Sequence, residues 1–215
     1  MLRPLFRALL RRLPQPVQRD LRLLRGLMER RPESTFARVA YSIPRQVVLI
    51  TTRHDGAEDV WALDAHTHLS FEPSLYGIAV NKNGYGAELV RCSGVFIVNF
   101  VPATWETVIL FCGNVSGRTV DKFAASGLRK EEGESVNAPR LADSLGALEC
   151  KVRQTLEVGD HTLFIGEVTH RILRAEAPRL HHLDVRLREI AATWEERSDG
   201  PAAIASGQGS TGRTA

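Results

Sequence analysis

The stretch that decides the fold runs from Asp59 to Val101 and reads DVWALDAHTHLSFEPSLYGIAVNKNGYGAELVRCSGVFIVNFV. Its pattern predicts, in order, a strand at 60–63, a polar loop, a strand at 74–80, a short helix at 86–92 and a strand at 95–101. The hydrogen-bonding side chains of the loop are Asp64, His66, Thr67, His68 and Ser70. Because the flanking strands fix what such a loop presents, we expect a small-molecule site here.

The rest of the chain predicts more strands than helices. The run QVVLITTR at 46–53 is typical of a strand, and the segments 147–158 and 161–173 form a hairpin around Gly159-Asp160. Short helices are expected at 104–111, capped by Thr104, and at 120–126. The segment 128–139 has no regular pattern, and 184–196 is consistent with a final helix. Short strands with helical insertions indicate a small β-barrel and disfavour a doubly wound sheet.

Composition limits the class of protein. The 215 residues are 43% hydrophobic and 25% charged, which suits one domain with a sizeable core. Three cysteines without a C-x-x-C pair argue against a disulfide framework or a zinc knuckle, and indicate a reducing, cytoplasmic location. No apolar run approaches the roughly 20 residues of a membrane-spanning helix. Glycine-rich phosphate-binding motifs are absent.

The positive net charge belongs to the N-terminal segment. Residues 1–31 carry nine arginines against Asp20 and Glu29, a local charge of +7 within a whole-chain charge of +3, so residues 32–215 carry −4. A basic body that binds nucleic acid is therefore not indicated. The pattern of residues 1–31 predicts an amphipathic helical arm. Three interpretations are open: an arm that packs on the body or on a partner subunit, a helix on a membrane surface, or a cleaved presequence. We expect residues 32–197 to form one domain, and the composition of 198–215 predicts a disordered tail.

Five motifs in a fixed order make a resemblance specific. They are PRQVVLITTR (44–53), LSFEPSLYGIAV (69–80), GVFIVNF (94–100), SGRTVDKF (116–123) and GDHTLFIGEV (159–168). In this order they resemble the flavin reductase-like family, the FMN-binding split-barrel flavoproteins. The resemblance implies a mainly β, Greek-key split barrel and a homodimer with FMN near the subunit interface. It also implies an oxidoreductase that transfers electrons from NADH or NADPH through flavin to free flavin or another acceptor.

The resemblance also assigns residues to the flavin site. The segment along the flavin ring and ribityl chain corresponds to Leu63, Asp64, Ala65, His66, Thr67, Leu69 and Ser70. The phosphate is assigned to Asn81, Lys82, Tyr85 and Gly86, and the mouth of the site to Arg118 and Lys122. His161 falls where the family keeps a histidine near the reacting face. The chemistry agrees, because Lys82 and the start of the following helix offer a cation and N–H donors to a phosphate.

This chain departs from the family pattern at a few positions. Asp64-Ala65 replaces a small hydroxyl residue followed by an aromatic, and Gly86 stands where serine or threonine is usual. A carboxylate beside an anionic cofactor costs free energy unless Lys82 or Arg118 compensates it. A second hypothesis is therefore a split-barrel binding or structural module that has lost tight flavin binding.

Each candidate residue also has a purely structural interpretation. His66 and His68 share one face of a strand, as metal ligands do, but no cysteine or third histidine lies nearby in sequence, so we expect no metal. His161 is also consistent with an ordinary hairpin-end residue, and Arg118 and Lys122 with a solvated helix face.

Overall fold

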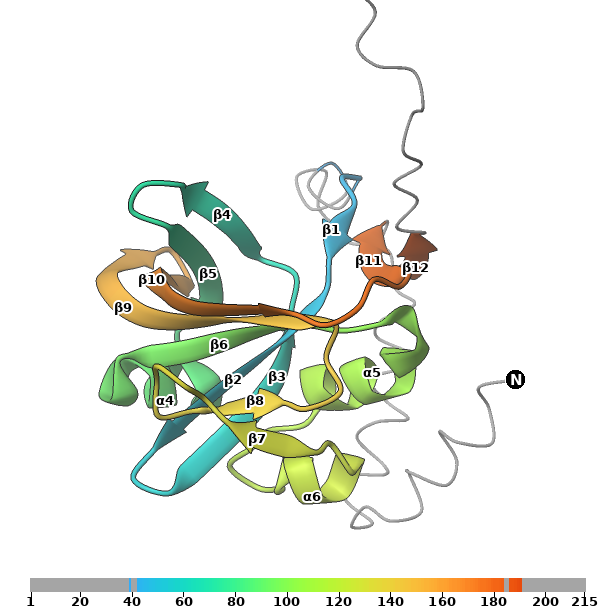
Figure 1. The fold of residues 1–215 in the computed structure, drawn as a ribbon, viewed down its shortest axis with the longest axis horizontal. Coiled ribbons are helices and arrows are strands. Elements are labelled where there is room, and N and C mark those ends of the chain that lie inside the picture. Colours follow the sequence, from blue (N-terminus) through green and yellow to red (C-terminus); the bar gives the residue numbers. More distant parts are fainter. Residues whose placement is uncertain (1–38, 40–41, 184–185, 191–215) are drawn as a thin grey trace, which may run out of the picture.

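The computed structural model describes residues 39, 42–183 and 186–190 (Figure 1). The predicted N-terminal arm, 1–31, and the predicted tail, 198–215, lie outside these residues. Within the described ranges, no helix is long and apolar enough to cross a membrane.

One antiparallel sheet forms the body of the molecule. Its strands are β2 (Val48–His54), β3 (Ala57–Leu63), β4 (His66–Ser70), β5 (Leu75–Asn81), β6 (Val95–Phe100), β9 (Gly146–Val158) and β10 (His161–Leu173). They lie in the order β3-β2-β6-β9-β10-β5-β4. The edge strands β3 and β4 are joined by Asp64 and Ala65 alone, so the sheet curls and its two edges come together at that connection (Figure 1). The predicted mainly β fold is confirmed.

Strand β4 corrects the sequence prediction of a long polar loop. Residues 66–70 pair with β5 from His66 opposite Ile78 to Ser70 opposite Leu75, so only Asp64 and Ala65 connect the strands. The polar composition concealed this strand because β4 is a sheet edge. An edge strand needs a partner for one side of its backbone only, and its outward side chains remain in solvent.

Two smaller sheets complete the strand set. The first contains β1 (Arg45–Gln46), β11 (Arg179–Leu183) and β12 (Arg186–Ile190), and the second contains β7 (Lys130–Glu132) and β8 (Pro139–Leu141). The helix predicted at 184–196 is wrong for its described part, because 186–190 pairs with β11 as a strand. The segment 128–139 is likewise not wholly irregular, since it contains β7.

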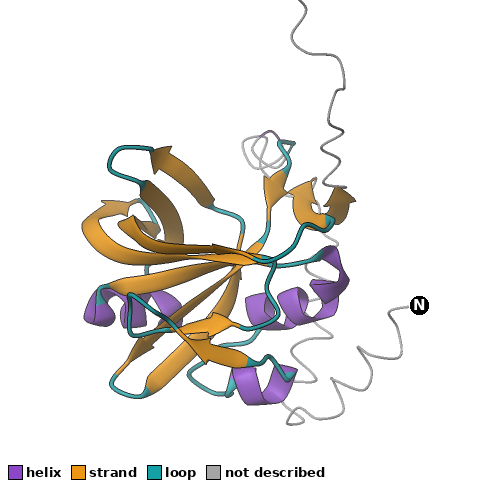
Figure 2. Ribbon diagram, in the orientation of Figure 1, coloured by secondary structure: helices purple, strands orange, loops and turns teal. Residues whose placement is uncertain are grey.

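The helices lie against the β2–β3 part of the sheet (Figure 2). They are α4 (Tyr85–Ser93), the 3-10 turn η1 (Ala103–Trp105), α5 (Glu106–Asn114) and α6 (Lys122–Ser126). The prediction of Thr104 as a helix cap is wrong, because Thr104 lies within η1 and α5 begins without a side-chain cap. Helix α6 does have one, since the Asp121 carboxylate accepts a hydrogen bond from the Ala124 N–H.

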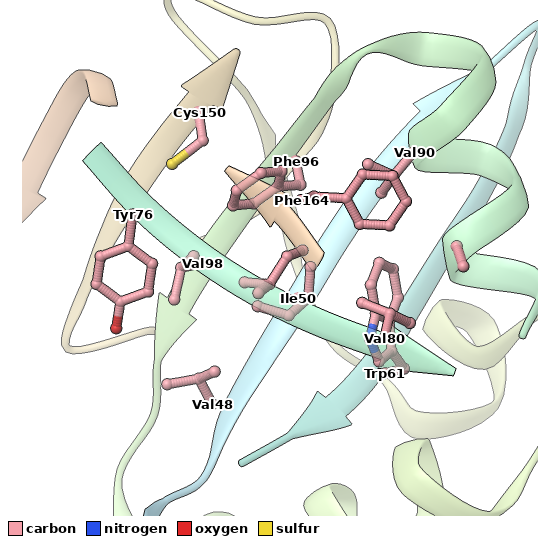
Figure 3. Close-up of a cluster of buried hydrophobic side chains, with 12 residues drawn as sticks. Val48, Ile50, Trp61, Tyr76, Val80, Val90, Phe96, Val98, Cys150 and Phe164 are labelled. Atoms are coloured by element: carbon pink, nitrogen blue, oxygen red, sulfur yellow. The ribbon is translucent and has the colours of Figure 1, made fainter. Parts of the chain in front are cut away.

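Apolar side chains fill both faces of β2 and β3. The cluster inside the curled sheet is drawn in Figure 3 and includes Val48, Ile50, Trp61, Tyr76, Ile78, Phe96 and Phe164. A second cluster, on the face covered by α5 and α6, includes Leu49, Val60, Ile109, Phe111 and Phe123. The alternation of Val48 and Ile50 with Leu49 thus builds two cores from one strand.

A buried ion pair fastens α6 to β3. Lys122 Nζ lies 2.7 Å from Asp59 Oδ1, and the two side chains are 2% and 3% exposed. Lys122 Nζ also donates to the Cys112 carbonyl at 3.4 Å. Burial raises the pKa of Asp59, and the Lys122 charge opposes that rise. The predicted alternative of a solvated helix face is therefore wrong for Lys122, whose charge is committed to Asp59.

We expect Lys122→Met to lower the free energy of unfolding by about 3–5 kcal/mol, since it leaves the Asp59 carboxylate buried without its counter-charge. Urea denaturation of the full chain measures the change. Lys130→Met is the matched control, because Lys130 pairs with Glu58 at a more exposed position and its loss should cost about 0–1 kcal/mol. Equal losses in the two variants would contradict a structural role for the buried pair.

Candidate functional site

A cavity of about 330 Å³ lies beside helix α4. Its lining residues are Lys82, Asn83, Gly84, Glu88, Arg91, Cys92 and Arg118. Three of these side chains are cations and one is a carboxylate, so the lining favours an anionic ligand. Two of the cations, Lys82 and Arg118, are residues that the family resemblance assigned to the phosphate and the mouth of a flavin site.

The floor of this cavity is held by hydrogen bonds between three elements. Lys82 follows β5, and its Nζ donates to the Gly159 carbonyl at 3.1 Å. Arg91 of α4 donates to the Lys82 carbonyl at 3.1 Å and to Thr162 Oγ1 of β10 at 2.6 Å. The connection after β5 is therefore fixed between the helix and the β9–β10 turn before any ligand arrives.

Arg118 reaches the cavity from the opposite side. Its guanidinium lies 4.9 Å from the centre of the Tyr85 ring and forms an ion pair with Glu88. The neighbouring Gly117 allows this approach, because a Cβ there would lie 2.3 Å from Asp59 Oδ1. The loop before α6 thus packs directly on β3, and Arg118 projects from it over α4.

Gly86 is explained by its contact with Trp61. A Cβ at Gly86 would lie 2.6 Å from the Trp61 ring, so any larger residue would push α4 away from β3. The serine or threonine that is usual in the family does not fit beside this tryptophan. The departure at Gly86 is therefore a packing requirement of this chain.

Asp64 belongs to an ion-pair cluster on the other side of the β3–β4 connection. Its Oδ2 lies 2.9 Å from Arg45 and accepts a hydrogen bond from His182 Nδ1 at 2.6 Å. Arg45 and His182 are themselves cross-strand partners in β1 and β11. Partial burial by itself would raise the pKa of Asp64, but the His182 hydrogen bond and the Arg45 charge lower it below its ordinary value. The carboxylate is thus compensated by Arg45 and His182, which are the partners that the structure gives it in place of Lys82 or Arg118.

His66 forms two hydrogen bonds inside the curled sheet. Its Nε2 donates to the Gln46 carbonyl at 2.8 Å, so its Nδ1 accepts from the Tyr76 hydroxyl at 2.7 Å. Burial lowers the pKa of His66, which favours this neutral form, and raises the pKa of Tyr76 to about 12. Among the described residues, no cluster of three or more His, Cys, Asp or Glu side chains could hold a metal ion.

The remaining predicted residues are not among those that line the cavity. His161 begins β10 opposite Asn81, and its Nδ1 donates to Asp160 at 2.7 Å. The Lys82 N–H in turn donates to the Asp160 carbonyl at 3.1 Å, which ties the hairpin end to the cavity. Thr67 and Leu69 are exposed on β4, while Leu63 and Ser70 are partly buried at strand ends.

The structure thus brings together part of the predicted set. Lys82 and Arg118 line the cavity, with Asn81, Tyr85, Gly86 and His161 in adjoining positions. Lys122 lies beneath β3 and does not line it. The sequence analysis did not identify the lining residues Asn83, Gly84, Glu88, Arg91 and Cys92. The signal for three of them was present, because positions 88, 91 and 92 share one face of the predicted helix.

The curled antiparallel sheet places this protein in the mainly β class. The cationic cavity beside α4 indicates that the domain binds an anionic ligand. The flavin reductase like domain matches residues 40–191 of this sequence, which is more than half of the chain. The chain therefore belongs to the flavin reductase-like family, and the resemblance seen in the five motifs is confirmed.

Individual relatives agree with this assignment. The flavin reductase (NADH) of Kitasatospora aureofaciens is 29% identical over 168 residues, covering 77% of this chain and 83% of that protein. An uncharacterised protein of Archaeoglobus fulgidus is 32% identical over 132 residues, covering 60% and 73%. The NADH:FAD oxidoreductase of Streptomyces globisporus, solved in complex with NAD and FAD fragments, superposes with a TM-score of 0.67 at 25% identity, covering 74% of this chain and 93% of that chain.

We expect Asp64→Ser to lower the free energy of unfolding by about 1–3 kcal/mol, because Arg45 and His182 lose a partly buried acceptor. The folded-state pKa of Asp64 lies below its ordinary value of about 3.9, so this contribution is present above that pH and disappears as the pH falls through the folded-state pKa.

The measurement is urea denaturation of the wild type and the variant at pH 7 and near pH 3, where their difference should shrink. Asp143→Ser is the control, since Asp143 pairs with Arg129 at the surface. A variant that keeps its stability and binds FMN several-fold more tightly would show that Asp64 acts against the cofactor.

Proposed function

We propose that this protein is an FMN-dependent oxidoreductase that accepts a hydride from NADH or NADPH and passes electrons to free flavin or another acceptor. The observation that carries the proposal is the cavity beside α4, where Lys82, Arg91 and Arg118 converge. Lys82 and Arg118 are also assigned to the flavin site by family motifs in two separate segments of the sequence. Convergence of these two residues on one cavity supports a ligand with a phosphate.

The residues fit FMN in charge and position. Lys82 and Arg118 would hold the phosphate, and the backbone N–H groups in the first turn of α4, which has no side-chain cap, would add donors. The Leu63–Ser70 segment would lie along the ring and ribityl chain. When bound, the flavin supplies the redox chemistry, and the protein supplies orientation and electrostatics. The named relatives support both small-molecule partners, since one is a flavin reductase (NADH) and another was solved with NAD and FAD fragments.

His161 would border the nicotinamide position. Its hydrogen bond to Asp160 orients the ring, and the His161 side chain is 41% exposed at the hairpin end. That hydrogen bond, together with the electrostatic interaction with the His161 ring, lowers the pKa of Asp160. His161 would thus place the nicotinamide against the flavin without taking part in flavin binding itself.

We expect the full chain to quench FMN fluorescence on titration and to oxidise NADH or NADPH in its presence. His161→Ala should lower turnover by about tenfold to hundredfold, the cost of misplacing reacting groups by about 1 Å, while the FMN dissociation constant changes less than twofold. His54→Ala is the matched control, because His54 is also a surface histidine beside an aspartate, Asp55.

Two outcomes would contradict this function. A protein that neither quenches FMN nor retains it would instead be the flavin-free binding module. A His161→Ala variant with unchanged turnover would remove this histidine from the nicotinamide position.

We also propose a homodimer, supported by an apolar outer face on β4, β5, β10 and β9. Leu156 and Val158 of β9 and Leu69 of β4 are exposed. Leu163 lies between them, opposite Leu156 in the register and beside Leu69 across Gly77. Exposed apolar stripes of this kind mark protein contacts, and the family resemblance implies that the contact is with a second copy.

Light scattering on the eluting protein should give about twice the 23.8 kDa chain mass. Leu156→Lys should shift it to the monomer mass, because a lysine charge would be buried at the contact. Leu173→Lys, an exposed leucine at the far end of the same hairpin, should leave the mass unchanged. A wild-type monomer, or a dimer insensitive to Leu156→Lys, contradicts this interface.

A further inference from the structure

Glu88 is the single carboxylate among the described residues that line the cavity. It lies on α4 and forms an ion pair with Arg118, which comes from the loop before α6. Both side chains are about half exposed, at 50% and 48%. The pair therefore joins α4 to the loop before α6 within the cavity lining, and both side chains remain accessible to solvent.

The other two cations of the lining are engaged differently. Lys82 Nζ donates to the neutral carbonyl of Gly159. Arg91 donates to the Lys82 carbonyl and the Thr162 hydroxyl, and the nearest carboxylate, that of Glu157 at 3.7 Å, lies outside the cavity lining. Arg118 is thus the lining cation whose charge is neutralised by a carboxylate of the cavity itself.

An ion pair at this exposure is readily exchanged. Exposed arginine–carboxylate pairs contribute little net stability, because water screens them and ordering two long side chains costs entropy. A phosphate dianion offers arginine more charge and a bidentate acceptor. A phosphorylated ligand therefore competes with Glu88 for Arg118, whereas a neutral ligand leaves the pair intact.

We propose that Glu88 is a selectivity-determining residue, which occupies Arg118 in the ligand-free protein and must release it when a ligand phosphate binds. This inference rests on the proposed function and deepens it, because it names the residue that sets the affinity for the phosphorylated over the unphosphorylated flavin. Glu88 acts through Arg118 and opposes the phosphate; it is not assigned a contact with the flavin ring.

The test measures dissociation constants of FMN and riboflavin for the full chain by fluorescence quenching. Glu88→Gln should tighten FMN binding about two- to fivefold, the size of an exposed ion pair, and leave riboflavin binding within error. In the Arg118→Gln background the same Glu88 substitution should give no gain, because the competed cation is absent. Asp143→Asn is the matched control, since it removes one carboxylate from an exposed arginine pair outside the cavity.

Three results would overturn the inference. The first is that Glu88→Gln tightens the binding of FMN and riboflavin alike. The second is that its effect persists in the Arg118→Gln background. The third is that it weakens FMN binding, which would show that Glu88 is needed to position Arg118. A wild type that binds neither flavin counts against the proposed function instead. In that case the binding of inorganic pyrophosphate to the same cavity is measured by calorimetry. Glu88→Gln must tighten pyrophosphate binding. Unchanged binding in the variant, or no binding to either protein, overturns the inference as well.

Discussion

The contact between Gly86 and the Trp61 ring is the constraint on which the site depends. It places the first turn of α4 directly on β3. The separation is so small that residue 86 must be glycine, because a Cβ there would lie 2.6 Å from the Trp61 ring. From that position, Tyr85 lies under the Arg118 guanidinium, and Glu88 and Arg91 face the cavity. A shift of the helix by the size of a methyl group would move Glu88 and Arg91 relative to Arg118, which the loop before α6 holds separately. Glycine at position 86, where this chain departs from the family pattern, is therefore required for α4 to lie where its residues line the cavity.

Strand β3 is the element through which the remaining parts are positioned. Asp59 binds Lys122 and so fixes α6, Gly117 packs on the same aspartate, and Asp64 at the end of the strand binds Arg45 and His182. From the sequence, Lys122 and Asp64 were candidates for contact with a cofactor. In the structure, their charges instead form ion pairs that hold neighbouring elements together. The cations left to face the cavity are Lys82, Arg91 and Arg118, and only the last is paired with a carboxylate of the lining.

The sequence predicted those features that depend on local pattern. The apolar run at 95–101, the hairpin around Gly159-Asp160 and the helix that ends at Gly94 all appear as expected. Strand β4 and strand β12 were missed, because their backbone partners are β5 and β11 and most of their own residues are polar. The pairing of Glu88 with Arg118, and that of Asp64 with His182, joins residues 30 and 118 positions apart. No local pattern encodes such contacts; they follow from the curl of the sheet.

Hydrogen exchange followed by mass spectrometry, with and without FMN, tests the central claim that a phosphorylated flavin binds between β3, the start of α4 and the loop before α6. The account predicts slower exchange in 63–65, 81–88 and 116–118 when FMN is added, and unchanged exchange in the β7–β8 region, 130–141. Protection confined to other segments, or no protection at FMN concentrations that saturate related flavin reductases, would contradict it.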